Sequence, residues 1–318
     1  MKMLAWPLRI GGKVTTAILT SLLVLFACAQ ASAQCDVTGH ALQVLGSGGP
    51  IADDGRASTA YILWVDGKSK ILVDVGGGAF LRFGEAKADF RELDHIAISH
   101  FHTDHSADLV TLLKTGYFSN RSRPLGISGP GEGGLFPGLE EYLERTIGKK
   151  GAYAYLAGYL DGSGGLAHLQ PVTIDPANRE NVPVYGDQQS SIQIEAIGVP
   201  HGIVPTLAYR VRIEDNVIVF ASDQNGNDET FIDFAQNADI LVMHMVVPEN
   251  ISGAGRSLHA PPSRIGQIAE AANARTLVLS HFMARSIENF DANIQSIRNN
   301  YAGEIVVSSD LHCISLDN

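Results

Sequence analysis

Three histidines and one aspartate fall within the six residues His100-Phe101-His102-Thr103-Asp104-His105, and this cluster constrains the chain more than any other feature. It follows a short β-type run at 95–99 and precedes a stretch with helical periodicity, so it occupies a strand-to-helix turn. His100 and His102 can point the same way on an extended turn, whereas Asp104 and His105 can face a second point nearby. Imidazole nitrogen and carboxylate oxygen are ligands of zinc and similar ions. The cluster therefore predicts a metal site at a strand end, the alternative being a solvated polar loop.

Three further residues of the metal-binding type each end an apolar run in the second half of the chain. His201 follows 197–200, Asp223 follows 219–222 and His281 follows 277–280. Any one of them alone is more often a cap or a polar core residue. Together with the first cluster they are enough for two metal sites.

Short strands alternate with helical segments through both halves of the chain. Strands are expected at 41–45, 61–65, 70–75, 95–99, 125–128, 192–196, 207–213, 217–221, 240–243 and 276–279, with 305–307 closing the chain. Helices are expected at 106–113, 139–147 and 263–272. Asp66-Gly67 between two apolar runs predicts a hairpin. The pattern predicts one α/β domain over residues 36–318, with two sheets packed face to face and helices outside.

The first 33 residues have the pattern of a cleavable secretory signal peptide. A basic start precedes the apolar stretch 17–29, and the small residues Ala31-Ser32-Ala33 match a cleavage site. One alternative is a membrane anchor, but the apolar stretch is shorter than the ~20 residues that cross a bilayer. The other is a lipoprotein attached through Cys28. We expect a periplasmic or secreted protein with no stable membrane span after processing.

Processing would leave two cysteines and a strongly acidic chain. Cys35 and Cys313 can pair in an oxidising compartment or be unrelated thiols. The processed chain holds 20 Lys and Arg against 34 Asp and Glu, a net charge of −14. Because such a charge repels phosphates, nucleic acid is not expected as a partner.

The cluster at 100–105 resembles the HxHxDH motif of the metallo-β-lactamase superfamily, and Asp74, His201, Asp223 and His281 are similar to its other motifs in order. The resemblance implies a four-layer αββα sandwich of two mixed sheets that binds two divalent metal ions. Zinc is the expected metal, with manganese or iron as alternatives. It implies that one ion is held by His100, His102 and His201. The second would be held by Asp104, His105 and His281, with Asp223 bridging the two and Asp74 as a structural support.

Ala221-Ser222-Asp223 resembles the bridging-Asp motif of the branch that contains ribonuclease Z, arylsulfatases and phosphodiesterases. Ribonuclease Z enzymes carry a tRNA-gripping arm, in many bacterial forms between the third and fourth motifs. His201 and Asp223 are only 22 positions apart, so no arm fits there. Met245 follows His244 where this branch usually has an acidic residue, which puts a role for His244 in doubt.

These features predict an exported dinuclear hydrolase of small phosphodiesters or sulfate esters, acting through a hydroxide between the two ions. His259 is the candidate general acid, and Asp104 is the alternative proton carrier. The alternative functions are a β-lactamase or lactonase and a non-catalytic or redox metal-binding protein. The aromatic stretch 152–159 is interpreted as a packed surface segment, with a lid, a pocket wall or a homodimer surface as alternatives.

Overall fold

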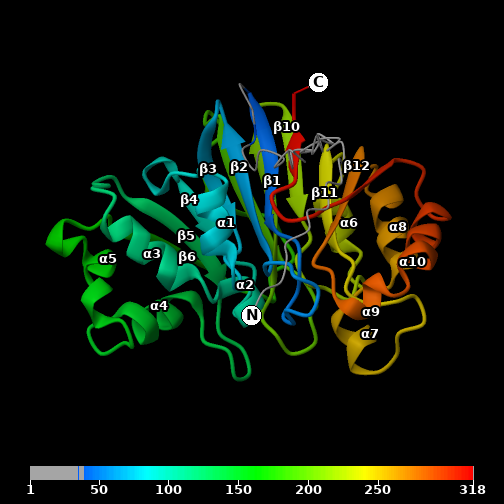
Figure 1. Cartoon of the computed structure of the whole chain (residues 1–318), viewed down its shortest axis with the longest axis horizontal. Coiled ribbons are helices and arrows are strands. Elements are labelled where there is room, and N and C mark those ends of the chain that lie inside the picture. Colours follow the sequence, from blue (N-terminus) through cyan, green and yellow to red (C-terminus); the bar gives the residue numbers. More distant parts are fainter. Residues whose placement is uncertain (1–34, 36–38, 318) are drawn as a thin grey trace, which may run out of the picture. The chain divides into compact units, whose positions relative to one another are not determined.

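The computed structural model describes Cys35 and residues 39–317, so the predicted signal peptide and Cys28 lie outside the described residues. The described strands form two seven-stranded sheets (Figure 1). From edge to edge, the first contains β14 (Cys313–Ser315), β1 (His40–Gly46), β2 (Ala60–Val65), β3 (Lys68–Val73), β4 (His95–Ala97), β5 (Leu125–Pro130) and β6 (Leu169–Ile174). The second contains β13 (Glu304–Val307), β12 (Thr276–Ser280), β11 (Ile240–His244), β10 (Asn216–Phe220), β9 (Leu207–Ile213), β8 (Ile192–Gly198) and β7 (Val182–Tyr185).

Helices cover the outer face of each sheet (Figure 1). Those on the first sheet are α1 (Ala79–Glu85), α3 (Leu109–Tyr117), α4 (Leu139–Ile147) and α5 (Gly158–Asp161). Those on the second are α6 (Thr230–Phe234), α8 (Pro262–Ala271) and α10 (Phe290–Arg298). The remaining helical turns are α2 (Thr103–Ser106), α7 (Ala254–Leu258), α9 (Ala284–Ile287) and the 3₁₀ turns η1 (Phe90–Glu92), η2 (Ala154–Leu156) and η3 (Ser163–Gly165).

Three apolar cores separate four layers. Alternate side chains of β1, β2 and β3 share one core with those of β8, β9 and β10 between the two sheets, and Leu63 and Val211 both belong to it. The opposite faces pack against helices, through residues such as Leu112 under the first sheet and Ile268 under the second. Since the central strands of each sheet are buried on both faces, they are apolar on both sides. The predicted αββα sandwich is confirmed.

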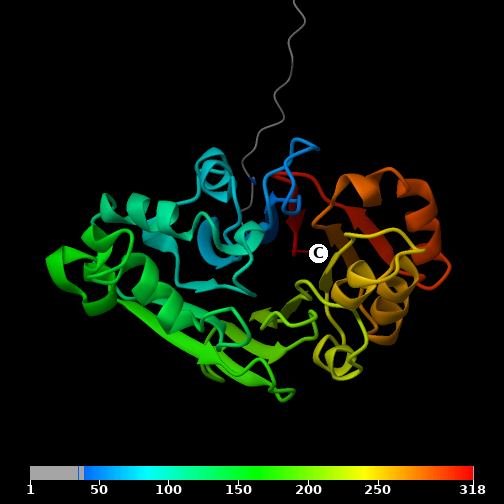
Figure 2. The same ribbon diagram turned by 90° about the horizontal axis from the view of Figure 1, so that it is seen from below.

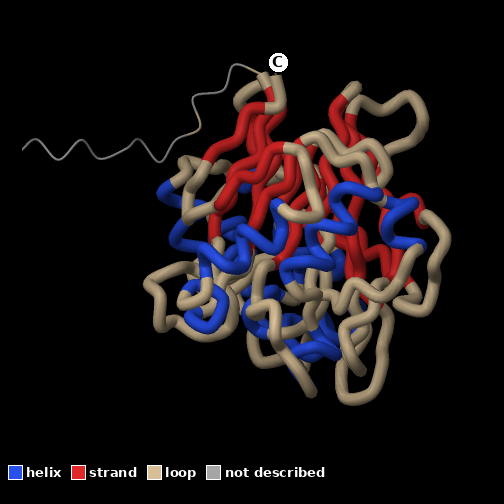
Figure 3. Tube along the Cα trace, turned by 90° about the vertical axis from the view of Figure 1, so that its right-hand side faces the viewer, coloured by secondary structure: helices blue, strands red, loops and turns tan. Residues whose placement is uncertain are grey.

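The carboxyl ends of the central strands meet at one end of the sandwich. β3, β4 and β5 are parallel in the first sheet, and β10, β11 and β12 are parallel in the second. Loops and short helices gather at this end, at the bottom of Figure 3, and Figure 2 views the structure from this side. Loops at the carboxyl ends of parallel strands are the usual place for a ligand site in open α/β sheets.

The predicted hairpin is confirmed, and the predicted helix at 106–113 is confirmed in part, because α3 begins only at Leu109 and continues to Tyr117. Asp66 and Gly67 both have positive φ, 51° and 69°, as a type I′ turn requires. The helical stretch breaks between α2 and α3. Asp108 is drawn into tertiary contacts there: its carboxylate accepts hydrogen bonds from the Gly78 and Phe80 amides at the start of α1, at 2.8 and 3.0 Å. Periodicity alone does not reveal such a long-range contact.

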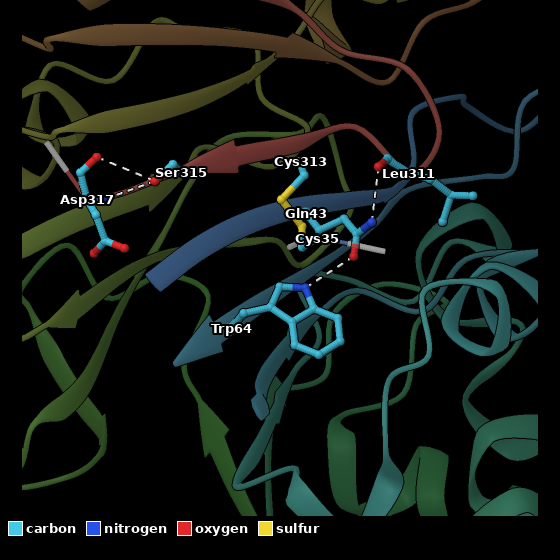
Figure 4. The surroundings of a disulfide bond; sticks show 7 residues. All are labelled: Cys35, Gln43, Trp64, Leu311, Cys313, Ser315 and Asp317. Carbon is cyan, nitrogen blue, oxygen red and sulfur yellow. Dashed lines mark hydrogen bonds between the residues drawn. A yellow bond between two sulfur atoms is a disulfide. The ribbon is translucent and has the colours of Figure 1, made fainter. Parts of the chain in front are cut away.

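The run 305–307 is a strand, β13, but it does not close the chain. The short β14 follows it and pairs antiparallel with β1, with Cys313 opposite Gln43. Cys313 is joined to Cys35 by a disulfide with a Cα–Cα distance of 5.6 Å (Figure 4). Three residues are too few for a period-two pattern to stand out, so only the pairing identifies this strand. Among the described residues, no helix combines the length and apolar character needed to cross a membrane.

Candidate metal centre

The residues of the candidate centre lie within a few positions of the ends of the strands that meet. Asp74 follows β3, the cluster 100–105 follows β4, and His281 follows β12. Asp74, Ser222 and His281 have positive φ values of 56°, 57° and 56°, in the left-handed region that non-glycine residues rarely adopt. Such strained positions persist only where the surrounding structure holds them, and they gather at functional sites.

The first group of ligand-type side chains contains His100, His102, His201 and Asp223, whose nitrogen and oxygen atoms all lie within 4.8 Å of one another. His100 Nε2 is 3.0 Å from His102 Nδ1, and His201 Nε2 is 3.6 Å from Asp223 Oδ2. His102 is half-buried and the other three are buried. These are the residues predicted for the first ion, together with the predicted bridge.

The second group lies on the other side of Asp223. His105 Nε2 is 3.1 Å from His281 Nε2, and His281 Nε2 is 3.2 Å from Asp104 Oδ2. Asp223 approaches this group too, with Oδ1 3.4 Å from His281 Nε2. The structure thus brings all seven predicted ligand residues together, with Asp223 between the two groups.

Asp74 orients one of the ligand-type histidines through a hydrogen bond. Its Oδ2 accepts a hydrogen bond from His105 Nδ1 at 2.8 Å, and its Oδ1 accepts one from the Ser99 amide at 2.7 Å. Because His105 donates through Nδ1, its Nε2 is the atom left facing the centre, as in carboxylate–histidine–metal arrangements. Burial lowers the pKa of His105, but the Asp74 carboxylate outweighs this and raises it to about 9.

The donor set fits zinc or a similar ion. His201 donates through Nδ1 to the Leu258 carbonyl at 2.9 Å, which leaves its buried Nε2 without a hydrogen-bond partner. An unpaired buried polar atom costs about 1–3 kcal/mol, a cost that a bound cation removes. Imidazole nitrogens with two carboxylates are ligands that zinc, iron and related ions accept.

The charges of the centre also suit a cation. Burial raises the pKa of Asp104, but the hydrogen bond from His281 and nearby imidazoles outweigh this and lower it to about 2. Burial likewise opposes ionisation of Asp223, yet the surrounding histidines hold its pKa well below the usual range. Burial lowers the pKa of His259 to about 3. At neutral pH the two carboxylates are therefore ionised and His259 is neutral.

A cavity of about 440 Å³ opens beside the two groups. The centre contributes His102, Asp104, His201, Asp223 and His281 to its wall; the other lining residues are Pro50, Phe101, Thr103, Val246, Leu258, His259, Met283 and Arg285. His259 therefore lies beside the centre, where the sequence placed it. The aromatic stretch 152–159 does not line this cavity: Tyr159 is buried with its hydroxyl on the Leu113 carbonyl, and Tyr155 is exposed.

His244, whose role the sequence left in doubt, belongs to the centre. It ends β11, and its Nδ1 lies 2.6 Å from Asp223 Oδ1. Met245 is not acidic, which argues against His244, but His244 lies at the end of an apolar strand, the position that also precedes His281. By contrast His95 is a structural residue, buried in β4 with Nε2 2.9 Å from Ser128 Oγ.

The fold and the paired groups of ligands define a metal-dependent hydrolase of the metallo-β-lactamase fold. The chain belongs to the beta-lactamase superfamily domain family, whose model matches residues 70–282. This range runs from β3 to the residue after His281 and so includes every predicted metal ligand.

Curated relatives point to the ribonuclease Z-like branch, and solved structures share the fold. Ribonuclease Z of Mycobacterium bovis (strain BCG / Pasteur 1173P2) is 25% identical over 295 residues, covering 86% of this chain and 98% of the relative. Ribonuclease Z of Archaeoglobus fulgidus is 26% identical over 268 residues, covering 76% and 86%. The fold resembles the metallo-beta-lactamase fold protein YhfI of Bacillus subtilis, with TM-score 0.66, 21% identity and coverage of 86% and 98%. It also resembles human tRNase Z, short form, with TM-score 0.66, 20% identity and coverage of 87% and 100%.

These comparisons overturn two predictions from the sequence. Relatives that match along nearly their whole length are named ribonuclease Z, so the predicted hydrolysis of small phosphodiesters or sulfate esters is wrong. The predicted exclusion of nucleic acid, with a small anionic ester as the partner, is wrong for the same reason. The argument from a net charge of −14 failed because net charge averages the whole surface. Charges farther than ~8 Å from a scissile phosphate are screened at physiological salt, so the local centre decides.

Proposed function

We propose that this protein is a metal-dependent ribonuclease that hydrolyses phosphodiester bonds in RNA. The observation that carries the proposal is Asp223, placed between two groups of ligand-type side chains at the wall of an open cavity. Ribonuclease Z relatives covering 86% of the chain support RNA as the substrate class.

In this proposal His100, His102 and His201 hold one divalent ion, Asp104, His105 and His281 hold the other, and Asp223 is shared. When bound, such ions supply positive charge to the phosphate oxygens and a water of lowered pKa.

The protein's own residues orient the centre and the substrate. Asp74 sets the ring of His105, and the Leu258 carbonyl sets the ring of His201. Arg285 is the one Lys or Arg among the residues that line the cavity. Its Nε donates to the Val246 carbonyl at 3.1 Å, which orients the guanidinium to bind a phosphate of the RNA.

His259 remains the candidate general acid, which would give a proton to the oxygen that leaves phosphorus. It lines the cavity, its Nδ1 is 3.9 Å from Asp223 Oδ2, and that buried nitrogen has no hydrogen-bond partner in the described structure. An imidazole there can hydrogen-bond the oxygen that departs from phosphorus. Asp104 is the alternative carrier of the proton.

Export is also proposed. The signal-peptide pattern of residues 1–33 predicts it, and a disulfide between Cys35 and Cys313 is typical of proteins in oxidising compartments. Attachment through Cys28 is the alternative. Mass spectrometry of the amino-terminal peptide of protein secreted by an expressing cell tests this, because cleavage after Ala33 would leave Gln34, or its cyclised form, at the amino terminus.

The test of activity uses purified, zinc-loaded protein and an end-labelled RNA that carries a 3′ extension. We expect cleavage that is lost after chelation and restored by zinc. Asp104→Ala is the control for a contaminating nuclease, because it alters the centre alone. RNA left intact by zinc-loaded protein, or cleavage that survives both chelation and Asp104→Ala, would refute the proposal.

A further inference from the structure

The two sheets are joined at the candidate centre by a hydrogen-bonded chain of three side chains. Tyr61 lies on β2 of the first sheet, whereas His244 ends β11 of the second. The Tyr61 hydroxyl lies 3.0 Å from His244 Nε2, and His244 Nδ1 lies 2.6 Å from Asp223 Oδ1. All three side chains are buried, and the Tyr61 ring also packs against Phe220, with centroids 5.3 Å apart. The centre is thereby connected to the core between the sheets.

The direction of each hydrogen bond follows from chemistry. An ionised carboxylate only accepts, so the short contact to Asp223 requires the hydrogen on His244 Nδ1. A neutral imidazole carries a single N–H, so His244 Nε2 is an acceptor. The Tyr61 hydroxyl must then donate to it. Both ring nitrogens of His244 are thus occupied by protein partners.

We infer that His244 is not a metal ligand but a positioning residue, which together with Tyr61 holds the shared carboxylate of Asp223. By distance alone His244 belongs with the second group of ligand-type side chains, beside His105 and His281. Its hydrogen bonds argue otherwise, because a ligand needs a ring nitrogen with a free lone pair.

The orientation of Asp223 explains why such support matters. Its Oδ1 is 3.4 Å from His281 Nε2 in the second group, and its Oδ2 is 3.6 Å from His201 Nε2 in the first. Rotation of the carboxylate would move both oxygens away from their groups. The hydrogen bond from His244 to Oδ1 holds the carboxylate in the one orientation that reaches both groups. Residues that hydrogen-bond to metal ligands orient those ligands in the same way in known metal sites.

The inference rests on the metal centre of the proposed function but not on RNA as the substrate, so metal binding decides it. Zinc affinity and zinc content per chain are measured for the full chain by competition with a chromophoric chelator. The variants are His244→Leu, which removes the donor; His244→Asn, whose amide nitrogen can replace Nδ1; and Tyr61→Phe. Tyr159→Phe is the matched control, because it removes another buried hydroxyl, one that donates to the Leu113 carbonyl away from the centre.

We expect His244→Leu to weaken zinc binding about 10- to 100-fold, the usual effect of losing a residue that hydrogen-bonds to a metal ligand. His244→Asn should recover most of that loss, Tyr61→Phe should weaken binding less than His244→Leu, and Tyr159→Phe should bind zinc as the wild type does. An amide is a poor zinc ligand, so equal losses in His244→Asn and His244→Leu would identify His244 as a ligand and overturn the inference. The inference would also be overturned if all three variants, Tyr61→Phe, His244→Asn and His244→Leu, bound zinc with wild-type affinity. If His244→Leu does not fold, equal zinc loss in His244→Asn and in the ligand variant His201→Asn still overturns it. A wild-type protein that binds no zinc would instead refute the centre itself.

Discussion

Removing the disulfide between Cys35 and Cys313 should destabilise the protein by several kcal/mol. The two residues are 278 positions apart, so the bond closes a loop that contains nearly the whole folded chain. The chain-entropy relation gives about 5.6 kcal/mol at 25 °C for a loop of this length. Denatured chains are more compact than the ideal polymer of that relation, so we expect about 3–5 kcal/mol.

The native contacts around the bond should largely survive its loss. The Gln43 side chain donates to the Leu311 carbonyl at 3.0 Å and accepts from Trp64 Nε1 at 3.1 Å, which keeps the segment before β14 beside β1 (Figure 4). The disulfide therefore acts mainly on the unfolded chain, and the double variant Cys35→Ser/Cys313→Ser should fold, with β14 as its least stable strand.

The assay is urea unfolding of the unprocessed chain followed by circular dichroism, with the wild type, the double variant and Cys28→Ser as the control cysteine. We expect a lower midpoint in the double variant alone. Thiol titration of the denatured, unreduced protein should find one free thiol in the full chain and none in a chain cleaved after Ala33, since the sequence has three cysteines. Equal midpoints for the wild type and the double variant, with the disulfide shown intact in the wild type, would refute the reasoning.

Three further predictions concern the centre, the core and the cavity. Asp104→Ala should lower zinc content from two ions towards one per chain and reduce RNA cleavage at least about 100-fold, measured by elemental analysis and initial rates; unchanged values would place the chemistry elsewhere. Burial lowers the pKa of His95 from its ordinary 6.5 to about 3 in the folded protein. As the pH falls, the unfolded chain therefore binds a proton at this position before the folded chain does. The free energy of unfolding should fall between pH 6.5 and 3, by up to about 1.4 kcal/mol per pH unit. His95→Gln should flatten this slope of unfolding free energy between pH 6 and 4, whereas the exposed His168→Gln should leave it unchanged; an unaltered slope in His95→Gln would contradict the assignment. Arg285→Met should raise the KM for RNA about tenfold with a smaller change in kcat, because a charged hydrogen bond to phosphate is lost, whereas the exposed Arg298→Met should change neither; equal effects would indicate a general influence of charge.

Local chemistry accounts for what could be predicted from the sequence. The cluster at 100–105 and the residues ending three apolar strands predicted the metal centre, because parallel strands bring their carboxyl ends to one edge of a sheet. Asp66-Gly67 predicted its hairpin because the turn needs two residues that tolerate positive φ. In each case the determining residues are neighbours in the chain or follow a repeated local pattern.

Only the tertiary structure decided the contacts between distant segments. The helical stretch breaks before α3 where Asp108 bonds to the start of α1, β14 exists because β1 pairs with it, and Cys35 reaches Cys313 across 278 positions. His244 has a place in the centre because Tyr61 and Asp223 approach it from other strands. The same limit explains the wrong prediction about nucleic acid. Net charge is a sum over all residues, whereas binding depends on which charges the fold brings within a few ångströms of a phosphate.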